Sequence, residues 1–338
     1  MAETVVVVGS ETLLGREIRD IVASGPAAFE LRLIAADEEV AGRLTRVGDE
    51  PLTVTPLAAE NLADARAIVL AASAEAGRKA LEMAAGAGFS GGIADLSYAA
   101  EEHPNARLRA PQVEAQAEME AEHDGGTIQV IAHPAAIALA LFLRRLQALE
   151  PIRRSVVQIF APASEHGARG VEELQNQTIS LLSFKTLPHA VFDTQLSFNL
   201  LSKYGEEAPA SLEESELRIE RHLASLLALE GEGEGAPMPS LRLVQAPVFH
   251  GYSFSAWVEF DSDFEVEPLE GSLASANIEV RGGEFEPPNN VSQAGQSGIT
   301  VGGIMPDRNA AQACWFWVVA DNFRVAAENA MAVVREMV

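Results

Sequence analysis

The chain has 338 residues, which exceeds the usual size of a single hydrophobic core, so two domains are expected. Its formal net charge of −25 argues against nucleic acid or an anionic membrane surface as a partner, because either would repel it. The single cysteine, Cys314, cannot form an internal disulfide, and no cysteine and histidine cluster offers a metal site. The first apolar run is too short for a signal peptide or membrane anchor, so we expect a cytoplasmic protein.

The first part of the chain alternates strand and helix patterns. Residues 4–9, TVVVVG, form a β-branched run closed by glycine, which is typical of a strand buried on both faces of a parallel sheet. Strands that alternate with helices indicate an α/β fold with a doubly wound parallel sheet of the Rossmann type. The expected strands are 4–9, 30–36, 51–55, 67–72, 91–95 and 127–132, and the expected helices are 12–24 and 74–87.

The pattern changes near residue 151, where long β-rich segments appear. They cover 153–164 and 241–260, and helical stretches lie at 168–182 and 211–229. This arrangement predicts a broad antiparallel sheet with helices on one face, and so an α+β domain. The predicted domains are therefore 1–132 and 133–319, with a C-terminal helix over 320–338 that packs back on the first domain.

A turn with two glycines follows the first strand, in the context where a dinucleotide-binding fingerprint is expected. Gly9 and Gly15 take the first and third glycine positions, but Thr12 stands in the middle position, where glycine lets the backbone approach a pyrophosphate. The turn therefore fits two roles equally, shaping the fold or binding a nucleotide. The candidate cofactor-binding residues are Gly9, Thr12, Leu13, Gly15, Asp37 and Ser73.

Five further stretches, together with the opening strand and its glycine turn, give the chain its resemblance to a known family. In the order of the chain they are 161–178, 196–201, 246–253, 299–307 and 317–324. They resemble the aspartate-semialdehyde dehydrogenase family along nearly the whole chain. The resemblance implies a dinucleotide-binding domain, a dimerisation domain of the semialdehyde dehydrogenase type that carries substrate groups, and NADP-dependent chemistry through a cysteine thioester.

In that family the nucleophilic cysteine follows an Asn-Pro-Asn run, and the matching position here is Ala136, after His133 and Pro134. A methyl group cannot attack an aldehyde carbon, so no covalent intermediate can form at this position. Loss of a covalent nucleophile costs other enzymes on the order of 10⁶ in turnover. Cys314 lies in an apolar run, where a lone cysteine behaves as a small buried hydrophobe. We therefore predict no dehydrogenase activity.

The other catalytic and substrate positions that the resemblance implies are also altered. The acid/base histidine corresponds to Tyr252, and an unperturbed tyrosine, with a pKa of about 10, is a poor proton shuttle at neutral pH. His250 offers an alternative base, since in a strand it would point to the same face as Tyr252. A metal or small anion between His133 and His166 is a further alternative. At four further positions the resemblance implies a residue that this chain has replaced. Ala161 stands where the family has a positioning glutamine, and Gln245 where it has a carboxylate-binding arginine. Glu216 and Glu101 stand where it has a lysine and an arginine that bind phosphate.

The cofactor and partner predictions follow from the same comparison. Carboxylates at 37–39 repel the 2′-phosphate of NADP, whereas Asp37 can accept a hydrogen bond from a 2′-hydroxyl, so NAD is compatible, NADP is disfavoured and no cofactor is certain. Tryptophans 257, 315 and 317 are expected in the core or in a subunit contact, and a homodimer follows if the second domain pairs as in the family.

Two functions remain open at the level of the sequence. The first is a homodimeric interaction or regulatory protein, including a partner of a true dehydrogenase. The second is an NAD(P)-dependent oxidoreductase or nucleotide-binding protein with altered chemistry. Overall similarity alone would label the chain an aspartate-semialdehyde dehydrogenase of amino-acid biosynthesis.

Overall fold

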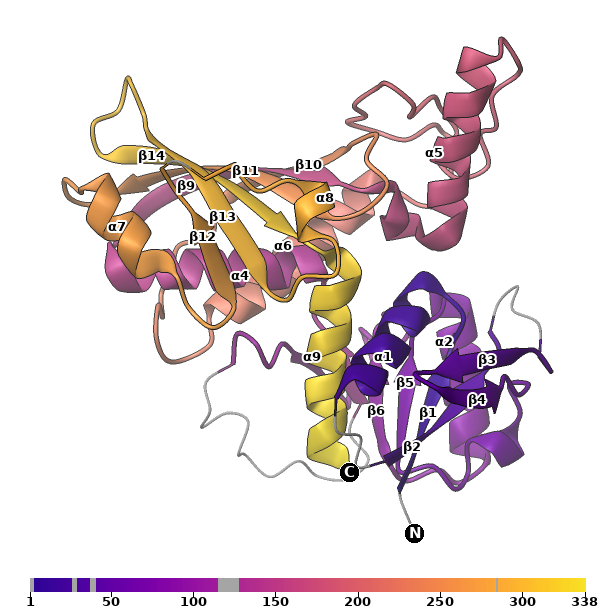
Figure 1. Ribbon diagram of the computed structural model, residues 1–338. Coiled ribbons are helices and arrows are strands. Elements are labelled where there is room, and N and C mark those ends of the chain that lie inside the picture. Colours follow the sequence, from indigo (N-terminus) through magenta and orange to yellow (C-terminus); the bar gives the residue numbers. More distant parts are fainter. Residues whose placement is uncertain (1–2, 26–28, 37–40, 115–127, 284) are drawn as a thin grey trace. The chain divides into compact units, whose positions relative to one another are not determined.

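A computed structural model describes residues 3–25, 29–36, 41–114, 128–283 and 285–338 (Figure 1). The chain divides into two compact units. The first comprises Met1–Ala132 and Ala326–Val338, and the second comprises His133–Val325. In the described part of the chain, no helix combines the length and the apolar composition that a bilayer crossing requires.

The first unit contains the predicted parallel sheet, with strand order β2-β1-β5-β6-β8-β7. Val5, Val6, Val7 and Val8 of β1 have no exposed surface, as expected for a central strand covered on both faces. The strand order reverses beside β1, which places the glycine turn at the topological switch point of the sheet. The elements are β1 (Glu3–Val8), α1 (Leu13–Ser24), β2 (Phe29–Ile34), β5 (Ala67–Leu70), α2 (Ala74–Gly86), β6 (Gly92–Asp95), β7 (Ala106–Arg109) and β8 (Ile128–Ile131).

Three strands of this unit differ from the sequence prediction, and one of them, over 44–47, was not expected at all. The segment expected over 51–55 forms β4 (Glu50–Thr53), which pairs with β3 (Leu44–Val47) in a separate two-stranded sheet. Three of its four residues are exposed, so it lacks the apolar faces that the main sheet requires. The edge strand β7, of sequence ARLR, was missed because half of its residues are arginines.

The C-terminal helix α9 (Asn322–Met337) begins in the second unit, and its later turns belong to the first. Ala320, expected at its start, instead ends a strand of the second unit. Within the first unit, the fully buried Arg109 places a guanidinium nitrogen 2.8 Å from Glu114 and 3.0 Å from Glu336 of α9. A buried cation held by two carboxylates is costly to break, so this cluster fixes the end of the helix to β7.

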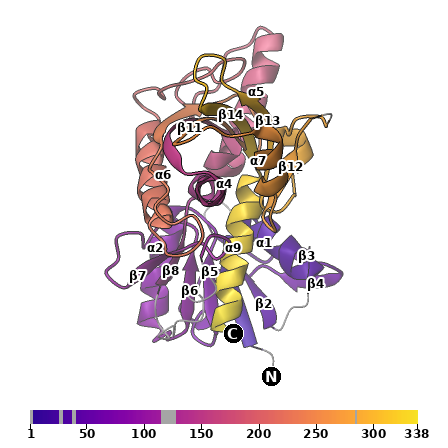
Figure 2. The same ribbon diagram turned by 90° about the vertical axis from the view of Figure 1, so that its left-hand side faces the viewer.

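The second unit is built on a six-stranded sheet of order β10-β9-β11-β14-β13-β12. The sheet is mixed rather than antiparallel as predicted, since β10 runs parallel to β9 and β12 parallel to β13. Helices α4 and α6 lie on one side of it (Figure 2). The elements are α4 (Pro134–Leu149), β9 (Ile152–Ala161), η2 (Ala163–His166), α5 (Gly167–Leu182), α6 (Leu212–Leu227), β10 (Ser240–Gln245), β11 (Tyr252–Phe260), α7 (Val266–Leu273), β12 (Ile278–Arg281), α8 (Asn290–Gln293), β13 (Ile299–Pro306) and β14 (Ala313–Ala320).

Alternation along the central strands separates a core face from an open face of this sheet. Phe254, Ala256 and Val258 of β11 are fully buried on the side of the helices. The residues between them point to the opposite side, where Trp257 lies directly across from Trp315 and Ser255 from Trp317. All three tryptophans of the chain therefore lie on the open face of the sheet.

Candidate functional site

The glycine turn of the first unit brings three of the predicted cofactor residues together. Gly9 has φ +86°, and a Cβ on Gly15 would lie 2.0 Å from the carbonyl oxygen of Gly9, so only glycine fits at the start of α1. Thr12 caps this helix, because its hydroxyl accepts a hydrogen bond from the Gly15 N–H at 2.9 Å. The same hydroxyl lies 2.8 Å from the carbonyl oxygen of Ala71, so the side chain turns inward. Thr12 therefore serves as the cap that starts α1.

Two polar side chains beside this turn bear on nucleotide binding. Ser10 is fully buried, and among the described residues its hydroxyl oxygen has no hydrogen-bond partner. An unpartnered buried hydroxyl at a helix N-terminus fits an anionic group that would complete the site. Glu11 also stands next to the turn, and its carboxylate is 2.7 Å from the Arg19 guanidinium, which balances its charge within the protein.

The remaining predicted residues of the first unit have separate places. Leu13 is the first residue of α1, and Ser73 caps α2 by accepting a hydrogen bond from the Ala76 N–H at 3.2 Å. Glu101 lies in a turn, where its backbone N–H donates a hydrogen bond to the carbonyl of Tyr98. Asp37 lies outside the described residues, so the structure leaves the predicted choice between NAD and NADP open.

In the second unit, Ala136 lies in the first turn of α4 and is 0% exposed. His133 caps this helix, because its Nδ1 accepts a hydrogen bond from the Ala135 N–H at 3.2 Å. The position of the expected nucleophile is thus a closed, apolar one beside the histidine that caps the helix.

Glu165, which the sequence did not single out, links two residues of the predicted site. Its Oε1 lies 2.9 Å from Nε2 of His133, and its Oε2 accepts a hydrogen bond from the Tyr252 hydroxyl at 2.7 Å. Both donors are buried, with the His133 and Tyr252 rings 6.0 Å apart in an edge-to-face arrangement. Tyr252 is therefore committed to Glu165, and its proton points at a carboxylate of the protein itself.

The network keeps Glu165 ionised over the physiological range. Burial raises the pKa of this carboxyl, but the electrostatic attraction of His133 and the hydrogen bonds from His133 and Tyr252 more than offset that, and lower the pKa to about 2. An anion held this firmly does not serve as a general base near neutral pH, because its affinity for a proton is too low.

We expect Glu165→Gln to destabilise the protein at pH 7 by up to about 3 kcal/mol, which is the size of the pKa change expressed as free energy. Because the pKa in the folded protein is depressed, this stabilisation is present above the ordinary value near 4.5 and is lost as the pH falls toward about 2. Urea unfolding of both proteins between pH 7 and pH 3 checks it. The difference in unfolding free energy should shrink below pH 4.5, and a constant difference would contradict the assignment.

A second buried network holds two more of the predicted positions. The Nε2 of Gln245 donates to the carbonyl of Ala161 at 2.9 Å, and its Oε1 accepts from the Tyr204 hydroxyl at 2.7 Å. That hydroxyl lies 2.9 Å from Nε2 of His166. Burial raises the pKa of Tyr204 and lowers the pKa of His166, so both stay neutral. Gln245 stands at the expected carboxylate-binding position, and both its side-chain oxygen and its side-chain nitrogen are hydrogen-bonded within the protein.

The two histidines considered as a metal or anion site, His133 and His166, are both hydrogen-bonded to other side chains of the protein. Nε2 of His133 is hydrogen-bonded to Glu165, and Nε2 of His166 to Tyr204. In the residues that the structure describes, no three histidine, cysteine or acidic side chains are grouped so that they could hold a metal ion.

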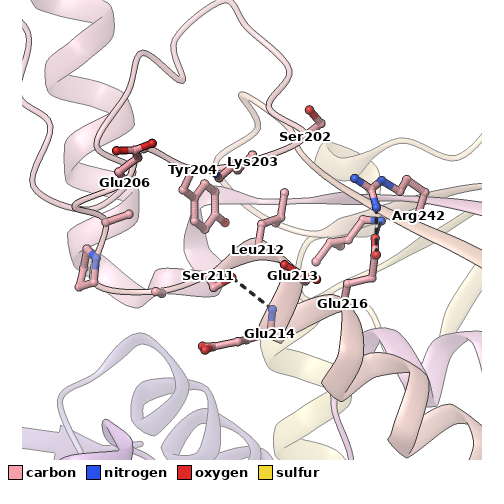
Figure 3. A pocket seen from close by; sticks show the side chains of 15 residues that line it. Ser202, Lys203, Tyr204, Glu206, Ser211, Leu212, Glu213, Glu214, Glu216 and Arg242 are labelled. Atoms are coloured by element: carbon pink, nitrogen blue, oxygen red, sulfur yellow. Dashed lines mark hydrogen bonds and ion pairs between the residues drawn. The ribbon is translucent and has the colours of Figure 1, made fainter.

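Glu216, at the expected phosphate-binding lysine position, lines a cavity of about 810 Å³ at the N-terminal end of α6 (Figure 3). Its carboxylate accepts from the Arg242 guanidinium at 3.2 Å and from the Leu243 N–H at 2.5 Å. Sequence reasoning missed Arg242, and with Lys203 it gives this cavity two cations. They face the carboxylates of Glu206, Glu213, Glu214 and Glu216, so the lining as a whole disfavours an anionic acyl phosphate.

His250 lies outside the strand that begins at Tyr252, so the premise of the alternative drawn from the sequence does not hold. Gly251 has φ +82° and lies before the start of β11, so the alternation of a strand does not extend to His250. Its Nε2 lies 2.8 Å from Asp321, and its Nδ1 lies 3.3 Å from the Ser164 hydroxyl. Ser164 is buried and also bonded to Asn322, so this serine is held by its neighbours and closed to a substrate.

Cys314 is an equally poor nucleophile. It is fully buried on β14, where it lies opposite Val258, and burial raises the pKa of its thiol to about 12. The thiol donates to the carbonyl of Met305. Six residues of strand separate it from Ala320, the partner of Tyr252, which is a distance of about 20 Å. Its place in the core agrees with the expectation from the sequence.

Comparisons with known proteins match almost the whole chain. Residues 143–325 match the family described as semialdehyde dehydrogenase, dimerisation domain. An aspartate-semialdehyde dehydrogenase of Prochlorococcus marinus is 28% identical over 98% of this chain and 94% of its own length. A USG-1 protein homolog of Pseudomonas aeruginosa is 30% identical over 96% of this chain and 94% of its own length.

Solved structures give the same relationship. A probable aspartate-semialdehyde dehydrogenase from Pseudomonas aeruginosa matches with a TM-score of 0.82 and 28% identity, and covers 99% of this chain and 98% of its own. The aspartate semialdehyde dehydrogenase of Candida albicans, whose structure holds NADP, matches with a TM-score of 0.66 and 15% identity over 100% of this chain and 98% of its own.

Proposed function

The chain belongs to the semialdehyde dehydrogenase family, and we propose that it is a member without dehydrogenase activity, which acts as a homodimeric interaction or regulatory protein. The observation that carries this proposal is Ala136, a buried methyl group where the family's chemistry requires a thiol. A turnover assay with aspartate semialdehyde, phosphate and NADP tests it, with the Prochlorococcus marinus relative as the active reference.

The surroundings of Ala136 support the same conclusion. Tyr252 and His133 both bind Glu165, and Gln245 binds Ala161 and Tyr204, so the polar groups of the expected site satisfy one another. A substrate would have to replace these internal hydrogen bonds at the full cost of leaving buried groups unpaired. The site is therefore better suited to stability than to turnover.

A homodimer in a reducing, cytoplasmic compartment is part of this proposal. The match of residues 143–325 to a dimerisation domain and the open face with its three tryptophans support self-association. The single cysteine, buried and with a raised pKa, needs no oxidising environment. A protein partner, such as a true dehydrogenase, would then contact other surfaces of the dimer.

The glycine turn favours a second candidate function, nucleotide binding with altered chemistry. Gly9, Gly15 and the unpartnered Ser10 hydroxyl fit a pyrophosphate at the N-terminus of α1, and NAD or NADP would supply hydride transfer when bound. The sequence analysis favoured NAD over NADP because of the carboxylates at 37–39, which lie outside the residues that the structure describes. A relative of the same fold was solved with NADP, so both nucleotides enter the test on equal terms.

Under this second candidate we expect NAD or NADP to raise the melting temperature, since a ligand at 100 times its Kd adds about 2.7 kcal/mol. Thermal melting at increasing nucleotide concentration measures the effect. Ser10→Ala should reduce the shift without lowering the melting temperature of the free protein, because it removes a buried hydroxyl that has no partner. If neither nucleotide shifts the transition, this candidate fails and the interaction role remains.

A further inference from the structure

The cavity beside α6 takes no part in either candidate function. It measures about 810 Å³, within the range of about 300–1,000 Å³ that is typical of small-molecule sites (Figure 3). Its lining residues lie between 202 and 216 and at 242 and 243. Ala136, Gln245 and Tyr252, which stand at three of the altered catalytic and substrate positions, are not among them. The cavity can therefore bind a molecule without the use of those three positions.

The lining carries more negative charge than the protein neutralises there. Glu216 and Arg242 form an ion pair at 3.2 Å, so their charges cancel. The remaining charged groups are the ammonium of Lys203 and the carboxylates of Glu206, Glu213 and Glu214. All four residues are exposed, and within the described part of the chain none of the four side chains has a hydrogen-bond or ion-pair partner. Three carboxylates against one ammonium leave a net charge of −2, which favours a cationic ligand.

The carboxylates are spread out, which disfavours a metal ion as that ligand. Among the residues that the structure describes, no three histidine, cysteine or acidic side chains are grouped closely enough to hold one. Glu206 precedes α6, whereas Glu213 and Glu214 lie in the first turn of that helix. In Figure 3 the carboxylates of Glu206 and Glu213 lie on different sides of the Tyr204 ring. A ligand that reaches both must be longer than a single ion and must carry its positive charges apart.

Apolar surface separates these charges. Tyr204 is buried, and its hydroxyl donates to Gln245 at 2.7 Å, which fixes the ring in the wall of the cavity. Leu212 and Leu243 are also buried and belong to the same wall. An aliphatic chain is favoured on such a surface, and an aromatic ring attracts a cation placed near its face. The cavity thus matches a molecule that has methylene groups between two ammonium groups.

We propose that the cavity binds a small aliphatic diamine or polyamine, with one ammonium group paired to Glu206 and another to the carboxylates in the first turn of α6. The methylene chain of the ligand covers Tyr204 and Leu212. A dication offsets the net charge of the lining, which a monoamine can only halve. Each ammonium group donates up to three hydrogen bonds, and carboxylates are strong acceptors for them. This site goes beyond the proposed function, since neither inactivity nor nucleotide binding requires it.

Isothermal titration calorimetry of the full chain with 1,4-diaminobutane, at an ionic strength of about 0.15 M, tests the proposal. We expect saturable binding at one site in each chain. Binding of 1-aminobutane should be up to about fivefold weaker, because it has only one ammonium group to pair. Glu206→Gln and Glu213→Gln should each weaken binding of the diamine about two- to fivefold, as expected for an exposed ion pair, and together at least about fivefold.

Glu207→Gln is the matched control, because Glu207 is an exposed neighbour that does not line the cavity. It removes the same charge and should leave the dissociation constant unchanged. Circular dichroism should be the same for all variants, since the three substituted residues are exposed. A series of diamines of increasing length gives an independent readout, because affinity should pass through a maximum where the ammonium groups match the fixed carboxylates.

Diffuse attraction of cations to a chain with a net charge of −25 gives a different result. Glu207→Gln would then weaken binding as much as Glu206→Gln does, and affinity would show no optimum in diamine length. Either result would overturn the site, and so would equally tight binding of Mg²⁺ at the same ionic strength. The proposal also fails if neither 1,4-diaminobutane nor spermidine gives a saturable heat or raises the melting temperature.

Discussion

Ala136→Cys is expected to give far less dehydrogenase activity than an active relative, although it restores the thiol that the family's chemistry requires. The acid/base position would still be Tyr252, whose hydroxyl donates to Glu165. Loss of general acid/base catalysis alone costs about 10²–10⁴-fold. The positions of the family's glutamine and arginine would still be Ala161 and Gln245, which bind each other. We therefore expect turnover at least about 10²–10⁴-fold below that of the Prochlorococcus marinus relative.

The measurement is the rate of NADPH formation from aspartate semialdehyde, phosphate and NADP. Ala138→Cys is the matched control, since Ala138 is also a fully buried alanine of α4 but lies outside the expected nucleophile position. Thiol titration of both variants in the folded and unfolded states shows whether the new cysteine is accessible. If Ala136→Cys reached a rate within tenfold of the relative, the surrounding network would not be the barrier that its hydrogen bonds indicate.

The parallel sheet was predictable because its strands carry a strong signal. A run such as residues 5–8 is typical of a strand in the interior of a parallel sheet, and the glycine turn behind it marks the start of α1. The errors occur where that signal is weak. β4 and β7 are short and contain charged residues or proline. Whether such a segment forms a strand, and in which sheet, depends on the strand that it pairs with.

The part of the site that depends on a single residue could be predicted from the sequence. The part that depends on contacts among several residues could not. Ala136 could be located because His133 and Pro134 match the run that precedes the nucleophile in the family that the chain resembles. Glu165 could not, because in the sequence it is one acidic residue among many, and only the fold brings its carboxylate between His133 and Tyr252. The His250 alternative failed for a local reason, the left-handed Gly251 that precedes β11.

Arg242 was missed for a similar reason. It lies on β10, three residues before Gln245, and its ion pair with Glu216 joins a strand to a helix that is distant in sequence. The charge of the cavity beside α6 therefore depends on tertiary contacts as well as on the residues that match the family's pattern. A carboxylate that binds the neighbouring guanidinium of the protein leaves that cation less able to hold a substrate.

The inactivity of the wild-type chain is the central claim, and the steady-state rate of NADPH formation tests it most directly. Because no thiol stands at position 136 and the thiol of Cys314 has a pKa of about 12, we predict a rate on the order of 10⁶-fold below the Prochlorococcus marinus relative under the same conditions. A rate within a hundredfold of that relative, unchanged in a Cys314→Ser variant, would show that another group attacks the aldehyde and would contradict the account.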